Sequence, residues 1–238
     1  MKETKSIKAK KHNLNKHYNE WRKISWDAKE YKLKILNKID EVLDFLEETD
    51  VVYVAQLRIR IAYSIPAAEY QIAEKYFLKV VKNEELFANN PDILETTYQG
   101  LGDLYFETIQ YDKASDVYIK LLKINKIAVL LEEDILQMGI AMVNHSKGIY
   151  HNKAEELLLF VYNSCVCDEE MDHLMATETN YNLGLVKFKL KKYKEAKLYL
   201  EKALVLYKQR KWDCENIYQM LNCISDMVDN KPKSAPNY

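Results

Sequence analysis

The chain has 238 residues, of which 48% are hydrophobic, and its 35 lysines and arginines nearly balance its 36 aspartates and glutamates. This charge balance gives no case for a nucleic-acid-binding protein, and five glycines with four prolines supply too few turn residues for an all-β fold. Lys, Glu, Leu and Ile are abundant and favour helices. We therefore expect an all-α protein with a hydrophobic core.

The cysteines and the hydropathy pattern bear on the compartment. The four cysteines are too few for a disulfide scaffold and their spacing does not suit a zinc site; they are Cys165, Cys167, Cys214 and Cys223. No apolar run approaches the roughly 20 residues that cross a bilayer, and no apolar segment of a secretory signal follows the basic N-terminus. We expect a cytoplasmic protein with reduced thiols, no cofactor, no metal and no membrane contact.

The N-terminal part is expected to hold a basic tail and then a helical bundle. Residues 1–13 are rich in lysine and poor in large apolar side chains, which predicts a flexible tail. The sequence LNKHYNEWRKI then places Tyr18 and Trp21 on one helical face, which favours the core for Trp21. Trp26 lies at the following turn and is the better candidate for an exposed contact. The predicted bundle spans residues 14–66.

Two further helices complete this bundle. A wide apolar stripe over residues 31–46 predicts a long helix, and Thr49-Asp50 has the character of a cap for the next one. That helix is expected to end near Pro66, because proline disfavours helix for the residue before it. Residues 67–87 follow as a helical run that resembles the second half of a degenerate repeat.

The clearest repeat runs from Thr96 to Lys123. The residues at the positions typical of a tetratricopeptide repeat, a helix–turn–helix unit of about 34 residues, are Tyr98, Leu101, Gly102, Tyr105, Tyr111, Ala114 and Tyr118. Small residues such as Gly102 and Ala114 allow two helices to approach closely, and the tyrosines fill the seam between them. One unit cannot bury its apolar face alone, so it predicts neighbouring repeats in a stack.

Two more repeats are expected downstream, at residues 132–162 and 177–207. Gly139 and Gly184 take the glycine position in these units. They follow Gly102 at steps of 37 and 45 residues, longer than the family repeat of about 34, which predicts irregular loops.

The C-terminal end is expected to close the stack. Residues 212–228 form one more amphipathic pattern, which is typical of a capping helix, and residues 229–238 are expected to be a flexible tail. The repeats and this helix occupy residues 67–228. The predicted architecture is an N-terminal helical bundle followed by a right-handed superhelical solenoid of tetratricopeptide-like helix pairs.

Catalytic motifs are absent from the sequence. It contains no GxGxxG, GxxxxGK[ST], HExxH or GxSxG pattern. The five histidines are scattered, and His145 and His151 fall in a long loop where solvation explains them. We expect neither a catalytic nor a metal site.

A groove is expected instead, because the first helix of each pair lines the concave face of such a stack. Amide side chains there pair with the backbone of an extended peptide, and apolar side chains form pockets for its side chains. The residues expected to line a peptide-binding groove are Gln99, Asp103, Gln137, Asn144, Glu178, Tyr181, Asn182, Phe188, Lys189, Asn216 and Gln219. The alternative is that several of them pack between adjacent units.

Three stretches resemble the Rap proteins, members of the RNPP class of quorum-sensing peptide receptors of Gram-positive bacteria. LNKHYNEWRKI, at residues 14–24, is similar to the first helix of that family. KIDEVLDFLEETDVVYVAQLRIRI, at residues 38–61, is similar to its second and third helices. NYNLGLVKFKLKKYKEAKLYLEKAL, at residues 180–204, is similar to its most typical repeat. Because a generic repeat also matches the last stretch, the specificity of the resemblance rests on the N-terminal bundle.

The resemblance implies a cytoplasmic regulator that binds a response regulator or a transcription factor and is switched by a short signalling peptide. It implies that Asn182 anchors the peptide backbone. Family members that dephosphorylate a response regulator use a glutamine where this chain has residues 47–50, Glu-Glu-Thr-Asp, so phosphatase activity is not expected. The candidate residues for contact with the protein partner are Tyr18, Trp21, Trp26 and Thr49.

Three hypotheses follow. The favoured one is a non-enzymatic regulatory adaptor of Rap-like type that binds a protein partner through residues 14–87 and a short linear peptide in its groove. The second is a generic tetratricopeptide-repeat scaffold or chaperone, and the least favoured is a response-regulator phosphatase. The chain is shorter than Rap-type receptors, which is typical of a truncated or divergent member. Pairing into a homodimer through terminal helices stays open.

Overall fold

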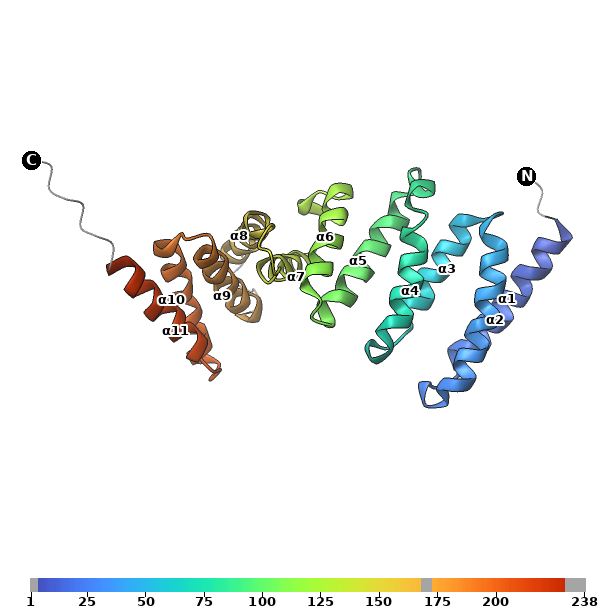
Figure 1. Cartoon of the computed structure of the whole chain (residues 1–238), viewed down its shortest axis with the longest axis horizontal. Coiled ribbons are helices and arrows are strands. Elements are labelled where there is room, and N and C mark those ends of the chain that lie inside the picture. The colour runs from blue at the N-terminus through green and yellow to red at the C-terminus, as the bar shows by residue number, and fades with distance from the viewer. Residues whose placement is uncertain (1–3, 168–172, 230–238) are drawn as a thin grey trace, which may run out of the picture. The chain divides into compact units, whose positions relative to one another are not determined.

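A computed structural model describes residues 4–167 and 173–229 of the chain. Within these residues the chain forms eleven α-helices and four short 3-10 turns, with no strand (Figure 1). The all-α fold class is confirmed, and consecutive helices pack as antiparallel pairs. The expected C-terminal tail, residues 229–238, lies outside the described residues apart from Asp229, where the last helix ends.

The chain divides into two compact units, residues 1–104 and residues 105–238, which we call the N-terminal unit and the C-terminal unit. The helix α5 (Pro91–Glu107) runs across this boundary. The boundary expected near residue 66 separates the bundle from the repeats, whereas the division at residue 104 separates two compact units. The two boundaries have different meanings, and the one near residue 66 stays a prediction.

The N-terminal unit consists of α1 to α4 and most of α5. The bounds of its first four helices are α1 (Lys5–Lys23), α2 (Lys29–Glu47), α3 (Val51–Tyr63) and α4 (Tyr70–Val81). Helix α1 packs on α2, and α3 packs on both α2 and α4. The core between them contains fully buried leucines and isoleucines together with Trp21.

Helix α1 begins at Lys5, whereas residues 1–13 were expected to be a tail. The lysines in this stretch are not simply solvated. The ammonium of Lys11 pairs with Asp50 at 2.7 Å and lies 4.8 Å from the centre of the Tyr53 ring. Asp50 also accepts a hydrogen bond from the Tyr53 N–H and so caps α3, as predicted. These partners are about 40 residues away in sequence, so a local composition argument missed them.

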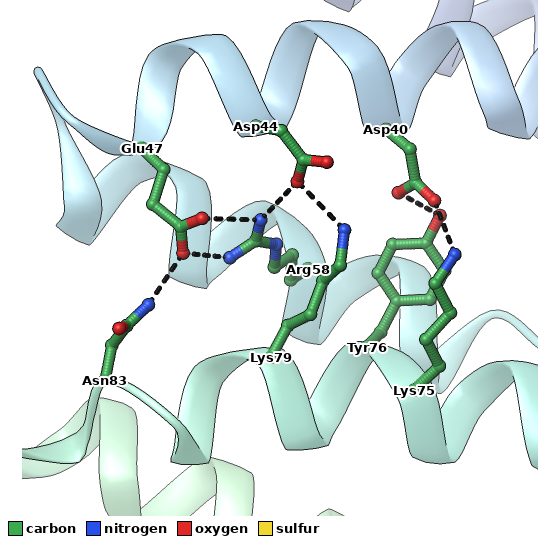
Figure 2. Close-up of polar contacts among 8 residues, drawn as sticks. All are labelled: Asp40, Asp44, Glu47, Arg58, Lys75, Tyr76, Lys79 and Asn83. Carbon is green, nitrogen blue, oxygen red and sulfur yellow. Dashed lines mark hydrogen bonds and ion pairs between the residues drawn. The ribbon is translucent and has the colours of Figure 1, made fainter.

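A row of carboxylates on α2 joins α3 and α4 to that helix, as Figure 2 shows. At one end of the row, Asp40 accepts hydrogen bonds from the Tyr76 hydroxyl at 2.6 Å and from the Lys75 ammonium at 2.8 Å, both on α4. Burial raises the pKa of Tyr76, and the charge of Asp40 raises it further. The tyrosine therefore stays neutral and keeps the proton that it donates to the carboxylate.

Arg58 of α3 is the centre of this row and is only 1% exposed. Its guanidinium donates to Asp44 at 2.8 Å and to both carboxylate oxygens of Glu47. Lys79 bonds the same oxygen of Asp44, and Asn83 bonds Glu47, each at 2.8 Å. A buried charge without such partners costs several kcal/mol, so the two carboxylates are what allow a guanidinium between these helices.

The C-terminal unit consists of the end of α5 and six further helices. Their bounds are α6 (Tyr111–Ile124), α7 (Glu132–Val143), α8 (His151–Cys167), α9 (His173–Lys189), α10 (Tyr193–Gln209) and α11 (Glu215–Asp229). Helices α7 and α8 form one pair, α9 and α10 form the next, and α7 also packs on α9. Helix α11 begins three residues later than expected, because Trp212 packs edge-on against Tyr207 and the Asp213 carboxylate accepts the Glu215 N–H.

Glycine marks the close crossing of each of these pairs. A Cβ at Gly184 would lie 2.6 Å from Cγ and 3.2 Å from the backbone nitrogen of Leu200 on α10. A Cβ at Gly139 would lie 2.8 Å from the side chain of Leu158 on α8. Both distances are well inside van der Waals contact, so a Cβ would displace the Leu158 side chain at position 139 and would press on both side chain and backbone of Leu200 at position 184.

Another buried cation lies in the α9–α10 pair, at the position where the repeat normally has tyrosine. Lys187 is 5% exposed, and its ammonium lies 2.5 Å from Glu155 of α8 and also bonds Glu195 of α10. Lys192 completes the group by pairing with Glu155 at 2.7 Å. Burial alone would raise the pKa of Glu155, but the two ammonium groups outweigh it and hold that pKa below its ordinary value. The lysine thus replaces a tyrosine by binding α8 and α10 electrostatically.

We expect Gly184→Ala to destabilise the C-terminal unit more than Gly139→Ala does. Alanine gains about 1 kcal/mol in helix propensity over glycine, while overpacking costs about 1–3 kcal/mol. The Cβ at position 184 meets backbone as well as side chain, whereas at position 139 it meets only the leucine side chain. Urea denaturation followed by circular dichroism measures the difference, and equal midpoints for the two variants would contradict it.

We expect Glu155→Leu to lower the free energy of unfolding by up to about 3–5 kcal/mol, because it removes one of the two carboxylates that compensate Lys187. The double variant Glu155→Leu/Lys187→Met should recover much of this loss, since no buried charge remains. The sign with pH follows from the lowered pKa of Glu155. Its contribution is present above the ordinary value of 4.5 and is lost as the pH falls through the lower folded value. Chemical denaturation between pH 3 and 7 should therefore show a flatter profile for the double variant, and parallel profiles would refute this.

Candidate functional site

A groove of about 540 Å³ lies in the C-terminal unit, and we call it the α7–α9 groove after the helices that form most of it. Its polar side chains come from one face of each helix. Glu133, Gln137 and Asn144 are four and seven residues apart on α7, and Glu178 and Asn182 are four apart on α9. Residues at this spacing share a helical face. The pairing of α7 with α8 and of α9 with α10 occupies other faces and leaves these side chains to the groove.

Apolar and aromatic side chains form the rest of the wall. They are Phe106, Leu136, Ile140, Leu174, Met175, Tyr181 and Tyr207. The rings of Tyr181 and Tyr207 lie 5.7 Å apart, which joins α9 to α10 on this side. The groove therefore combines amides and carboxylates with a continuous apolar surface.

Two asparagines of the groove are fixed by their own helices. The Asn182 side-chain amide donates to the carbonyl of Glu178 at 2.9 Å, and that of Asn144 donates to the carbonyl of Ile140 at 2.9 Å. Asn182 is only 6% exposed. Each bond fixes the plane of the amide, so the groups that remain for a ligand point in a defined direction. Gln137 makes no such bond and stays adjustable.

The groove is electronegative. Glu133 and Glu178 contribute carboxylates, and no lysine or arginine lines it. Lys189, expected in the groove, instead donates to the carbonyl of Val143 at 2.6 Å. Burial raises the pKa of Tyr207 to about 12, with further contributions from Tyr181 and from the charge of Glu178. The tyrosine is a neutral hydrogen-bonding group at physiological pH.

Of the eleven residues predicted for the groove, five are brought together in it: Gln137, Asn144, Glu178, Tyr181 and Asn182. Their role in binding stays a prediction. Leu174 and Met175 also line the groove but were not predicted, because they lie one turn before the expected start of the α9 face. Tyr207 was not predicted either, because the expected groove drew on the first helix of each pair and on the terminal helix, whereas this residue lies on α10. Tyr207 lies three turns after Ala196, and its contact with Tyr181 is apparent only from the three-dimensional packing.

The other predicted groove residues do not line it. Phe188 packs edge-on against Tyr193 and belongs to the apolar cluster between α9, α10 and α11. Asn216 and Gln219 are exposed on α11, where Gln219 donates to Glu215 of its own helix at 2.9 Å. Helix α11 thus presents these amides to solvent.

Gln99 and Asp103 belong to the N-terminal unit and bond each other. The Gln99 amide donates to both oxygens of the Asp103 carboxylate, at 3.0 and 3.2 Å. This i, i+4 contact on α5 uses the groups that were expected to meet a peptide.

The predicted partner-contact residues separate into buried and accessible ones. Trp21 is fully buried, so its ring is not available to a partner. It is stacked on Tyr18, meets Trp26 edge-on, and has the Lys32 ammonium 4.7 Å from its ring. Tyr18 and Trp26 keep one accessible side. Thr49 is exposed and its hydroxyl donates to the carbonyl at the end of α2.

The long loop between α7 and α8 is packed rather than solvated, contrary to expectation for His145. That residue is buried, and its Nδ1 accepts the Lys147 N–H at 3.2 Å. Ser146 bonds the Asp112 carboxylate of α6 through both its N–H and its hydroxyl. Tyr150 reaches Asp116 on the same helix at 2.7 Å. The loop is thus held to α6 by two aspartates one turn apart.

In the part of the chain that the structure describes, no group of three or more His, Cys, Asp or Glu side chains is placed to hold a metal ion. None of the described helices is long and apolar enough to cross a membrane. Cys214 and Cys223 are free thiols, while the side chains of Cys165 and Cys167 fall outside the described part.

Antiparallel helix pairs that cross at glycine define a helical-repeat protein. The tetratricopeptide repeat model matches residues 95–127 and residues 177–209, which are the two strongest repeats expected from the sequence. The chain therefore contains tetratricopeptide repeats at these two stretches, and repeats of this kind serve as scaffolds for protein–protein interaction. The match is to the general repeat and gives no sign of the Rap class in particular. Comparison with curated proteins gives no match, and comparison with solved structures gives none either.

Proposed function

We propose that the chain is a cytoplasmic, non-enzymatic regulatory adaptor that binds a short peptide segment in the α7–α9 groove and a protein partner on its N-terminal unit. The observation that carries this proposal is the gathering of Gln137, Asn144, Asn182 and their apolar neighbours in one groove. Side-chain amides satisfy the backbone N–H and C=O groups of an extended peptide, which a purely apolar groove leaves unpaired.

The size and rigidity of the groove support a peptide ligand. Its volume of about 540 Å³ falls within the range of roughly 300–1,000 Å³ typical of ligand sites. The fixed amides of Asn144 and Asn182 lower the conformational entropy lost on binding. Both carboxylates of the groove favour a segment with a positive charge over an acidic one.

The finer, Rap-like form of the proposal has a response regulator or a transcription factor as the partner and a signalling peptide as the switch. It is supported by the resemblance of the N-terminal helices and by the place of Asn182 in the groove wall. The second candidate, a scaffold or chaperone without a signalling peptide, uses the same groove for a segment of a client protein.

A non-enzymatic role is supported by the contacts at the position of the phosphatase glutamine. Glu47 is bonded to Arg58 and Asn83, and Thr49 bonds a helix-end carbonyl. These side chains hold the α2–α3 turn, and none of them presents an amide to an incoming phosphoryl group.

We expect Asn182→Ala to weaken peptide binding several-fold, since one lost hydrogen bond corresponds to about 1 kcal/mol. Asn180→Ala is the matched control. Asn180 is equally buried at 6% and bonds its own helix in the same way, at 2.7 Å to Ala176, but it does not line the groove. Calorimetric titration with short peptides selected from a random library measures both. An equal effect of the two substitutions would show that the groove is not the site.

We expect no acceleration of phosphate release from a receiver domain phosphorylated on aspartate. The measurement is the decay of the phosphorylated receiver with and without the chain, using a variant with Thr49→Gln as the comparison. Clear turnover by the unmodified chain would overturn the non-enzymatic proposal.

A further inference from the structure

A second cavity, of about 560 Å³, lies entirely within the N-terminal unit, between α1, α3 and the first turns of α5. Its character is opposite to that of the α7–α9 groove. Two arginines line it, Arg22 from α1 and Arg60 from α3, against a single carboxylate among the lining residues, Asp92. We call this cavity the Arg22–Arg60 pocket.

Both guanidiniums of the pocket are exposed and form no ion pair with any described residue. Arg58, which lies two residues before Arg60 on α3, shows the contrast, because it is buried and bonded by two carboxylates (Figure 2). Arg22 lies over the ring of Tyr18 at 5.8 Å, which orients it without neutralising it. The fold therefore pairs the guanidinium of Arg58 with two carboxylates and leaves Arg22 and Arg60 at a cavity without an ion-pair partner among the described residues.

The walls of the pocket are rigid and partly apolar. Tyr18 is stacked on the buried Trp21 with ring centres 6.0 Å apart. Tyr63 meets Phe77 edge-on, and its hydroxyl donates to the carbonyl of Thr96 at 3.1 Å. A Cβ at Gly100 would lie 2.6 Å from the Phe77 ring and 2.6 Å from the Tyr63 hydroxyl oxygen, so glycine there lets Tyr63 approach α5. Aromatic walls held in this way suit an anchor side chain of a partner.

We propose that the Arg22–Arg60 pocket docks an acidic segment of a protein partner, with carboxylates on the two guanidiniums and an apolar or aromatic side chain against Tyr18 and Tyr63. Arginine pairs with carboxylate in a bidentate geometry, and neither guanidinium has an ion-pair partner among the described residues. The inference rests on the proposed partner-binding role of the N-terminal unit, and it adds the chemistry of the segment that is recognised.

A nucleic acid would also meet arginine and tyrosine side chains, but the pocket favours a peptide. Nucleic-acid affinity comes from many phosphate contacts along a basic surface. This pocket is a local, open concavity with two cations and one carboxylate among its lining residues, on a chain whose net charge is −1.

The test is calorimetric titration of the full chain with the end-blocked hexapeptide Glu-Leu-Asp-Phe-Glu-Leu, at low and at moderate salt. We expect binding that weakens with salt, no binding of Lys-Leu-Lys-Phe-Lys-Leu, and at least a tenfold loss of affinity in Arg22→Gln/Arg60→Gln. The control is Arg210→Gln, since Arg210 also lies over a ring, that of Trp212, but belongs to the C-terminal unit. It should bind the acidic hexapeptide as the unmodified chain does.

A second variant guards against a folding effect. Arg22→Lys/Arg60→Lys keeps both charges but loses the bidentate geometry, and it should bind with intermediate affinity. Equal affinity of the chain and its Arg→Gln double variant, or tighter binding of hexauridylate than of the acidic hexapeptide, would overturn the inference. Weakening of the acidic hexapeptide by Asn182→Ala instead of by the arginine substitutions would also overturn it, and would leave the groove proposal standing.

Discussion

The close crossing of α9 on α10 at Gly184 is the contact on which the candidate groove depends. Because Leu200 fills the space that a Cβ would take, α9 presents a fixed face to α10 and another to α7. Helix α9 contacts neighbouring helices on several faces, so some of its buried positions carry polar residues. Helix α9 accordingly buries Asn180 and Asn182, and the side-chain NH2 group of each donates to the carbonyl four residues earlier. Because these bonds lie within α9, the side-chain NH2 groups need no acceptor from α7 or α10. Polar residues that line a groove can therefore coexist with tight helix packing.

Each unit contains a buried cation that carboxylates compensate, Arg58 in one and Lys187 in the other, and the arrangement differs between the two. Arg58 is placed between α2, α3 and α4 and is bonded by two carboxylates from one helix (Figure 2). Lys187 is placed between α8, α9 and α10 and is bonded by one carboxylate from each neighbour. Arginine presents a planar fork, which suits two acceptors on one face, while lysine is a point charge that accepts partners from separate directions. In both cases the desolvation of the cation is offset only in one arrangement of the helices, which favours that arrangement over other packings of the same apolar stripes.

Sequence alone identified the class of fold, the two matched repeats and five residues of the groove, because these depend on spacing along one helix. It failed where the partner is distant in sequence. Lys187 occupies a tyrosine position and has no local pattern, and its partner Glu155 lies 32 residues earlier on another helix. The composition of residues 1–13 predicts a tail where α1 has already begun, since composition does not reveal the ion pair of Lys11 with Asp50. The spacing of Asn144 and Asn182 predicts amides that face a peptide, but it does not reveal that each amide donates to a carbonyl of its own helix.

The two candidate surfaces have opposite charge, and the net charge of −1 conceals this. The α7–α9 groove has carboxylates and no cation among its lining residues, whereas the Arg22–Arg60 pocket has two guanidiniums and one carboxylate. Like-charge contact disfavours the wrong ligand as strongly as opposite charge favours the right one. An acidic segment is therefore repelled from the groove, and a basic segment is repelled from the pocket. Because the two surfaces belong to different compact units and select different chemistry, occupation of one need not compete with occupation of the other, which is what an adaptor with both a peptide and a protein partner requires.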